Sequence, residues 1–228
     1  FAMSVAAAEL PELSRLSGEP VAVAHRANAA LRRIAFWMLA SSLLLIAAGE
    51  PIVQMLFEGG EFGSDDTSLV WLILVFYAFG LPAIGLSRML QNASFAMGDT
   101  GGPARLAALR VTIAAVVGVL VMFPLDRAFI GADGIEALGD AIGLAGPLDV
   151  DQRTDESLVR LGAVGLAIGS AIGAWVELML LARLLDRRLP ALRPPSSALW
   201  PPTIAASIAF AVTAAMNLLT GSLPSLVA

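Results

Sequence analysis

Three charged side chains lie within or beside long apolar runs of this sequence: Arg88, Glu177 and Glu50. A guanidinium near hydrocarbon costs about 2.5–3.5 kcal/mol on insertion scales, so an arginine there needs a partner or a route to water. Because a guanidinium can hold a phosphate through two parallel hydrogen bonds, Arg88 is a candidate to bind a phosphate-bearing substrate. The alternative is a structural anchor whose side chain extends toward the helix end at Gly98.

The two carboxylates also have divided interpretations. Glu177 stands among apolar residues near Trp175, and a carboxylate in that setting is either protonated or paired. It could exchange a proton or bind a cation, or it could pair with Arg183 or another interior polar group. Glu50 comes directly before Pro51. It is either a functional charge at the mouth of a cavity or a turn-forming acid at the membrane interface.

Other kinds of site lack the residues that they need. The sequence has no cysteine and only one histidine, His25, so we expect no metal centre, no cofactor and no Ser-His-Asp triad. The segment DTGGP at 99–103 contains no lysine, and it predicts a tight turn rather than a phosphate-binding loop. The net charge of −5 argues against a nucleic-acid partner.

The composition indicates which elements must position these residues. Hydrophobic residues make up 57% of the 228 residues, charged residues only 14%, and the mean hydropathy is +0.80, which is typical of a chain that lies in a bilayer. Backbone groups in lipid must be satisfied within each segment, so the long apolar runs predict helices. We expect one all-α, polytopic transmembrane domain over residues 1–228. Residues 1–13 form the tail of an earlier helix, and about five membrane-spanning helices follow at 29–57, 67–97, 104–123, 158–185 and 199–219.

Within the fourth of these runs, small residues recur at intervals of four. Gly165, Gly169 and Gly173 share one face of the predicted helix. Glycines at this spacing let two helix backbones approach closely inside a membrane. The pattern therefore predicts tight packing of this helix against a neighbour.

The arginines predict how the helices are oriented. Ten of the 14 fall in or near alternate connections, and the opposite connections are mainly acidic, so the arginine-rich side is expected to face the cytoplasm. The segment 126–157 contains eight acidic residues. It is predicted to be a solvated outer loop, with a short amphipathic helix around residues 135–144.

Several stretches, taken in order, resemble motifs of one family of membrane proteins. They are PELSR at 11–15, NAALRR at 28–33, GEPIVQMLFEGGEF at 49–62, YAFGLP at 77–82, RMLQNASFAMGDTGGP at 88–103 and the whole run at 162–188. On these motifs, residues 4–188 resemble the C-terminal half of the MurJ/MviN-type lipid II flippases, which belong to the multidrug/oligosaccharidyl-lipid/polysaccharide exporter superfamily. The acidic segment 126–157 departs from the short connection usual in the family.

The resemblance implies a function. It implies a multi-pass protein of the bacterial cytoplasmic membrane that moves undecaprenyl-pyrophosphate-linked peptidoglycan precursor across the bilayer by alternating access, without acting as an enzyme. The implied partners are this precursor, the membrane lipids and an N-terminal lobe that precedes the chain, so we expect the chain to be a fragment. The charged residues most associated with substrate in the family lie in that lobe and just before Phe1, so none of them is assigned here. The candidate substrate-binding residues of this chain, Arg88, Glu50 and Glu177, are proposed from their own positions in the sequence.

Two other functions fit the same observations. One is a different member of the superfamily, such as a polysaccharide-lipid flippase or a drug/cation antiporter. The other is a membrane scaffold, or pseudo-flippase region, that transports nothing. Upstream helices with several interior arginines would favour the flippase, whereas a soluble or unrelated upstream domain would favour the scaffold.

Overall fold

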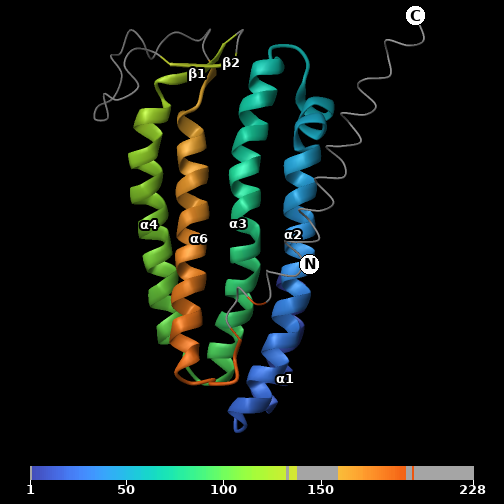
Figure 1. Cartoon of the computed structure of the whole chain (residues 1–228), viewed down its shortest axis with the longest axis vertical. Coiled ribbons are helices and arrows are strands. Elements are labelled where there is room, and N and C mark those ends of the chain that lie inside the picture. Colours follow the sequence, from blue (N-terminus) through green and yellow to red (C-terminus); the bar gives the residue numbers. More distant parts are fainter. Residues whose placement is uncertain (1, 132–133, 138–158, 194–196, 198–228) are drawn as a thin grey trace, which may run out of the picture.

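The computed structural model describes residues 2–131, 134–137, 159–193 and 197. The described part is an all-α bundle with a small sheet at one end, as Figure 1 shows, and this confirms the predicted fold class. Its helices are α1 (Ala2–Arg15), α2 (Pro20–Phe57), α3 (Ser64–Ala96), α4 (Gly101–Leu125) and α6 (Gly162–Asp186), and its strands are β1 (Ala128–Gly131), β2 (Gly134–Ala137) and β3 (Val159–Arg160).

Four helices in the described part, α2, α3, α4 and α6, are long and apolar enough to cross a membrane. They coincide with the first four predicted runs, and α1 coincides with the predicted tail at 1–13. The fifth run, 199–219, lies outside the described residues. Helix α2 begins at Pro20, well before the predicted start at residue 29. The predicted run begins after the polar residues His25, Arg26 and Asn28, whereas the helix continues through them back to Pro20.

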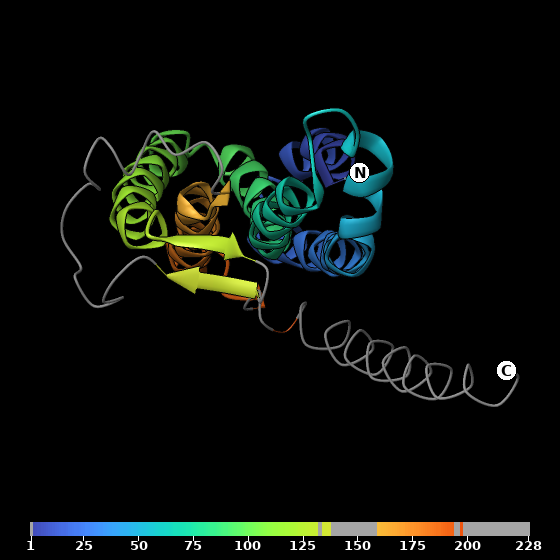
Figure 2. The same ribbon diagram turned by 90° about the horizontal axis from the view of Figure 1, so that it is seen from above.

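The spanning helices lie side by side and alternate in direction (Figure 1). Helix α6 packs against both α4 and α3, and α3 packs in turn against α2 and α1. Seen from above in Figure 2, α4 stands at one edge of the bundle and α2 near the other. The α1–α2 turn, the α3–α4 turn and the end of α6 therefore meet at one end of the bundle, which brings together the arginine-rich connections. Which side of the membrane this end faces stays a prediction.

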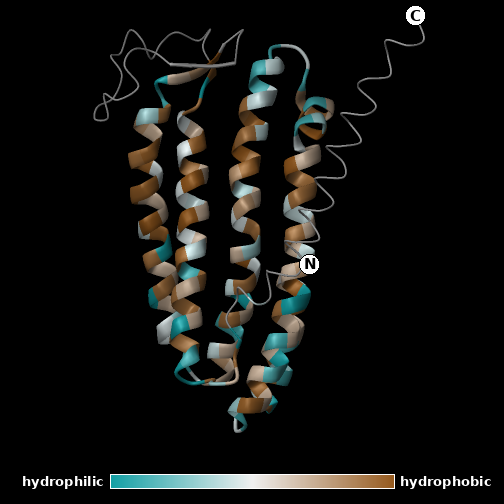
Figure 3. Ribbon diagram, viewed as in Figure 1, coloured by the Kyte–Doolittle hydropathy of each residue, from teal (hydrophilic) through white to brown (hydrophobic). Residues whose placement is uncertain are grey.

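The bundle exposes apolar side chains along its length. Figure 3 shows mostly hydrophobic residues over the middle of the helices and hydrophilic ones toward the ends. Large apolar side chains on the outside include Leu44, Val111, Val116 and Leu120. In water such a surface would promote aggregation, whereas lipid tails accept it. The structure is that of a multi-pass membrane protein.

The predicted close packing of the glycine face is confirmed, and the neighbour is α4. A Cβ added to Gly169 would lie 2.5 Å from the carbonyl oxygen of Ala114 and 2.5 Å from the Cα of Gly118. A Cβ on Gly165 would lie 2.5 Å from the backbone nitrogen of Met122. The two backbones thus touch directly, with no room for a side chain between them.

One prediction for the segment between α4 and α6 is wrong at its first residues. The short helix expected around residues 135–144 does not begin there, since Gly134–Ala137 is strand β2. Strand β2 pairs antiparallel with β1, and β1 also pairs with β3, so the sheet order is β2-β1-β3. Backbone pairing of β2 with β1 outweighed the weak local helical pattern at residues 135–137. Residues 138–144 lie outside the described part.

Candidate functional site

A polar cluster lies at the level where α3, α4 and α6 meet, with a buried centre and with Arg88 exposed at its edge. Its centre is Glu177, which is only 1% exposed. Arg88 lies eight residues before the end of α3, Arg110 nine residues after the start of α4, and Glu177 nine residues before the end of α6. At a rise of about 1.5 Å per residue, all three sit about 12–14 Å from the same end of the bundle. Charged residues of three helices thus lie at the same height along the bundle.

Both carboxylate oxygens of Glu177 have partners. The Nη1 of Arg110 donates to Oε2 at 3.1 Å, and the Nε2 of Gln91 donates to Oε1 at 2.8 Å. The Arg110 side chain is 22% exposed, so the ion pair is shielded on the Glu177 side and partly open on the Arg110 side. A carboxylate buried this deeply is stable only when paired in this way.

Gln91 connects this pair to Arg88. Its Oε1 accepts a hydrogen bond of 3.1 Å from the Nη1 of Arg88, while its Nε2 donates to Glu177. The chain Arg88–Gln91–Glu177–Arg110 therefore holds two guanidinium groups and one carboxylate, with a formal charge of +1. A guanidinium has five N–H donors, and Arg88 uses one of them in the contact with Gln91. The cluster can bind an anion without first breaking its own bonds.

A cavity of about 470 Å³ lies beside the cluster. Helix α6 contributes Ser170 and Glu177 to its lining, and α3 contributes Arg88 and Gln91. The α4 side consists of Arg110 and a run of small or branched apolar residues: Ala107, Val111, Ala114 and Ala115. Its chemistry is mixed, with a cationic part and an apolar wall, which suits an amphiphilic ligand better than a small ion.

The glycine face of α6 explains how these groups come together. Glu177 follows Gly165, Gly169 and Gly173 at the same spacing of four, so it continues the face that touches α4. A Cβ on Gly173 would lie 2.9 Å from the backbone oxygen of Arg110. One turn farther along α6, the carboxylate meets the guanidinium of that same residue. On the α3 side, Gly80 lets α6 approach, with Ala171 Cα only 3.3 Å from where its Cβ would be.

The structure brings together two of the three candidate residues. Arg88 and Glu177 belong to one network, and Glu177 pairs with Arg110 rather than with Arg183. Glu50 is exposed on α2, seven residues before that helix ends, roughly 25 Å along the bundle from the cluster by helix rise. The roles of these residues in substrate binding stay predictions.

Sequence reasoning missed Arg110 and Gln91. The distribution of arginines indicated only that Arg110 lies on the basic side, because it falls near the start of the apolar run at 104–123. Gln91 was read only as part of a motif. Its spacing from Arg88, three residues along one helix, was the available signal, because residues three apart lie on the same face.

The chain is similar to known membrane proteins. The model of the family described as lipid II flippase MurJ matches residues 1–137, more than half of the chain. The chain belongs to the MurJ family. A protein from Rhizobium tropici named "Probable lipid II flippase MurJ" is 31% identical over 139 residues, which cover 59% of this chain and 26% of that protein. The lipid II flippase MurJ of Thermosipho africanus is 28% identical over 144 residues, covering 63% of this chain and 29% of that protein.

The fold agrees with this membership of the MurJ family. A solved structure of lipid II flippase MurJ in an inward closed conformation superposes with a TM-score of 0.62 at 19% identity, covering 93% of this chain and 37% of that one. The likeness extends well beyond the residues that the family model matches. The chain spans about a quarter of the length of the curated MurJ relatives that it matches.

Proposed function

We propose that this chain forms the C-terminal lobe of a lipid II flippase of the bacterial cytoplasmic membrane. In this role it helps to translocate undecaprenyl-pyrophosphate-linked peptidoglycan precursor, together with an N-terminal lobe of the same transporter. No bond is made or broken, so the protein is a transporter and not an enzyme. Membership of the MurJ family supports this proposal, and the single structural observation that carries it is the cationic cluster at Arg88 and Arg110.

The cluster fits a pyrophosphate by charge and by position. Two guanidinium groups with one carboxylate between them leave one positive charge uncompensated, and attraction to an anion is stronger in a low-dielectric setting than in water. Glu177 holds Arg110 directly and, through Gln91, orients Arg88. Arg88 then offers its remaining donors as a planar fork, the geometry that suits phosphate oxygens.

Alternating access gives the cluster a role in the transport cycle. The two lobes rock against each other around a central cationic cavity, which shields the charged headgroup while the lipid tail stays in a side groove. The direct backbone contact between α4 and α6 would let these two helices move as one rigid unit, which is what a rocking lobe requires. Glu50, exposed on α2 toward the other end of the bundle, is proposed to lie at the cavity mouth.

Arg88 provides the test, because substrate contact and structural anchoring predict different substitution patterns. In the complete transporter, Arg88→Ala should restore the growth of a flippase-depleted strain less well than the unmodified protein does. Arg88→Lys should recover part of that growth, since the positive charge remains but the planar guanidinium fork is lost. A mere anchor would tolerate both Lys and Gln. Arg15→Ala is the matched control, because the Arg15 side chain is 79% exposed and lies outside the cluster.

Membrane abundance must be measured for each variant by quantitative immunoblotting. Full growth with Arg88→Gln at normal abundance would remove Arg88 from the substrate path. If Arg15→Ala reduced growth as much as Arg88→Ala does, the assay would report the loss of any arginine at the arginine-rich end of the bundle. The proposal would then lose its support.

A further inference from the structure

A second basic feature lies between α4 and α6, closer to the arginine-rich end than the cluster at Glu177. It is a groove of about 370 Å³ lined by three arginines, three leucines and one glycine: Arg105, Arg183, Arg187, Leu106, Leu180, Leu184 and Gly102. We call it the basic groove. It shares no lining residue with the cavity beside Glu177.

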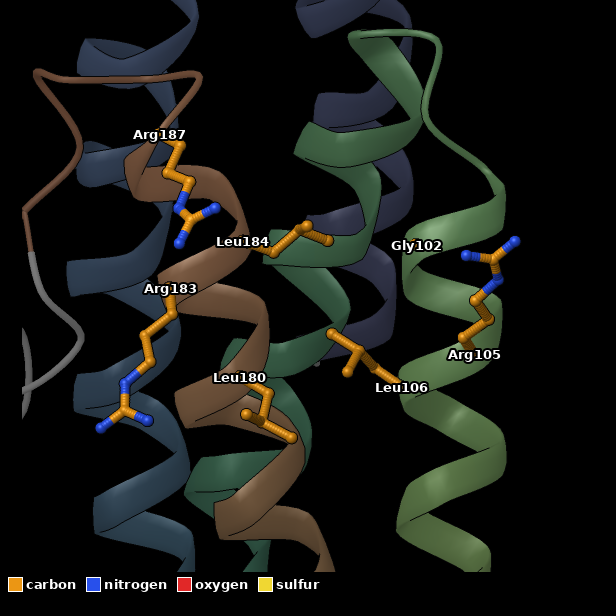
Figure 4. A pocket seen from close by; sticks show the side chains of 7 residues that line it. All are labelled: Gly102, Arg105, Leu106, Leu180, Arg183, Leu184 and Arg187. Carbon is orange, nitrogen blue, oxygen red and sulfur yellow. The ribbon is translucent and has the colours of Figure 1, made fainter.

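The three arginines of the basic groove carry uncompensated charge. Each is exposed, and none forms an ion pair within the part of the chain that the structure describes. The neighbouring carboxylate of Asp99 is already engaged, since it pairs with Arg188 at 3.2 Å and accepts a hydrogen bond from the backbone N–H of Gly102. The groove therefore has three positive charges at its edges, and Figure 4 shows the guanidinium groups of Arg105 and Arg183 directed away from the leucines.

Two of the three leucines, Leu106 and Leu180, lie deeper along the helices than the arginines, whereas Leu184 lies between Arg183 and Arg187. Figure 4 shows Leu106, Leu180 and Leu184 pointing into the space between α4 and α6, with arginines on both sides of them. Arg105 is in the first turns of α4, and Arg187 follows the last residue of α6. Leu180 is six residues before the end of α6, about 9 Å deeper by helix rise. The charges thus lie toward the end of the helices, and two of the three leucines lie deeper than they do.

This arrangement matches an amphiphile with a negative headgroup. Exposed arginine side chains change rotamer on a picosecond to nanosecond timescale, so they can close on a phosphate at the mouth of the groove. The leucines offer contact to an acyl chain that enters from the side. A negatively charged membrane surface attracts arginines that lie near it, and the arginine-rich end is predicted to lie at the cytoplasmic surface.

We propose that the basic groove binds an anionic phospholipid. Its arginines hold the phosphate, and its leucines contact the first part of one acyl chain. The site is distinct from the path proposed for the lipid-linked precursor, so it does not rest on the proposed function. A bound lipid there would fill the space between the ends of α4 and α6.

The test is native mass spectrometry of the chain in detergent, titrated with phosphatidylglycerol or phosphatidylcholine. We expect preferential phosphatidylglycerol binding, weakened about tenfold to a hundredfold when Arg105, Arg183 and Arg187 are all changed to Gln. The matched control changes Arg15, Arg32 and Arg33 to Gln, which removes the same charge from exposed positions on α1 and α2. The control should bind phosphatidylglycerol as the unmodified chain does.

A second variant tests the contribution of the apolar wall separately from that of the arginines. Leu106→Trp should narrow the apolar wall while all three arginines remain, and it should weaken phosphatidylglycerol binding without affecting binding of glycerol phosphate. Size-exclusion chromatography confirms that each variant is folded.

Three results would overturn the proposal. Equal binding of both lipids would remove the role of charge, and equal loss in the control triple would show diffuse attraction to many arginines. Displacement of the lipid by glycerol phosphate at matched concentration would indicate a small-anion site instead.

Discussion

The close backbone approach between Gly169 of α6 and the turn of α4 from Ala114 to Gly118 allows a sharp prediction about stability. In Gly169→Ala, the new Cβ would lie 2.5 Å from the Ala114 carbonyl oxygen, where ordinary contact begins near 3.4 Å. Neither neighbour is a flexible side chain, so the helices must separate locally by about 1 Å. A gap of 0.5–1 Å forfeits a quarter to a half of each dispersion contact beside it. We expect destabilisation of about 1–3 kcal/mol, the usual cost of overpacking.

The matched control is Gly101→Ala, since a Cβ at Gly101 meets nothing within 4 Å. Both substitutions restrict the unfolded chain to a similar degree, so the difference between them isolates the steric effect in the folded state. Gly118→Ala should fall between the two, because its Cβ would meet the Leu166 side chain at 3.3 Å. The free energy of unfolding is measured by titrating detergent-solubilised chain with sodium dodecyl sulfate and following circular dichroism. If Gly169→Ala and Gly101→Ala agreed within about 0.5 kcal/mol, α4 and α6 would not pack in this way.

Further predictions concern the other contacts of the bundle. Glu177→Leu should destabilise the chain by about 3–5 kcal/mol, because it leaves the guanidinium of Arg110 without its ion-pair partner. Adding Arg110→Leu should recover part of that loss in the same unfolding assay. A double variant as unstable as the single variant would contradict the pairing of these two residues. Asn28→Ala should lower the free energy of unfolding by about 1–3 kcal/mol, since the Asn28 side-chain amide donates to the Ala191 carbonyl and accepts from the Arg193 backbone N–H, each at 2.9 Å. An unchanged free energy of unfolding would show that the segment after α6 is held by other contacts. Single cysteines at Ser64 and Ser196, in a chain that has none, should react with an impermeant thiol reagent from opposite sides of the membrane, and labelling from one side would refute the five-span topology.

The sequence was sufficient to predict the four membrane-compatible helices that the structure describes and their alternation. Hydropathy determines them, because a backbone in lipid has to satisfy its own hydrogen bonds, and no distant contact can replace that requirement. The glycine spacing on α6 likewise predicted close packing, since spacing of four places residues on one face of any helix. The small sheet was not predicted, because strands of two to four residues leave almost no periodic pattern.

The sequence alone determined that two charged residues, Arg88 and Glu177, lie inside membrane-compatible apolar runs. They are conspicuous there because a charged side chain in hydrocarbon is costly. Only the tertiary structure decided their partners. Gln91 and Glu177 are 86 residues apart, and Arg110 and Glu177 are 67 apart, so no local pattern links them. Helix packing supplies the link, because the glycine face of α6 touches α4 at Arg110 and carries the carboxylate one turn farther to its guanidinium.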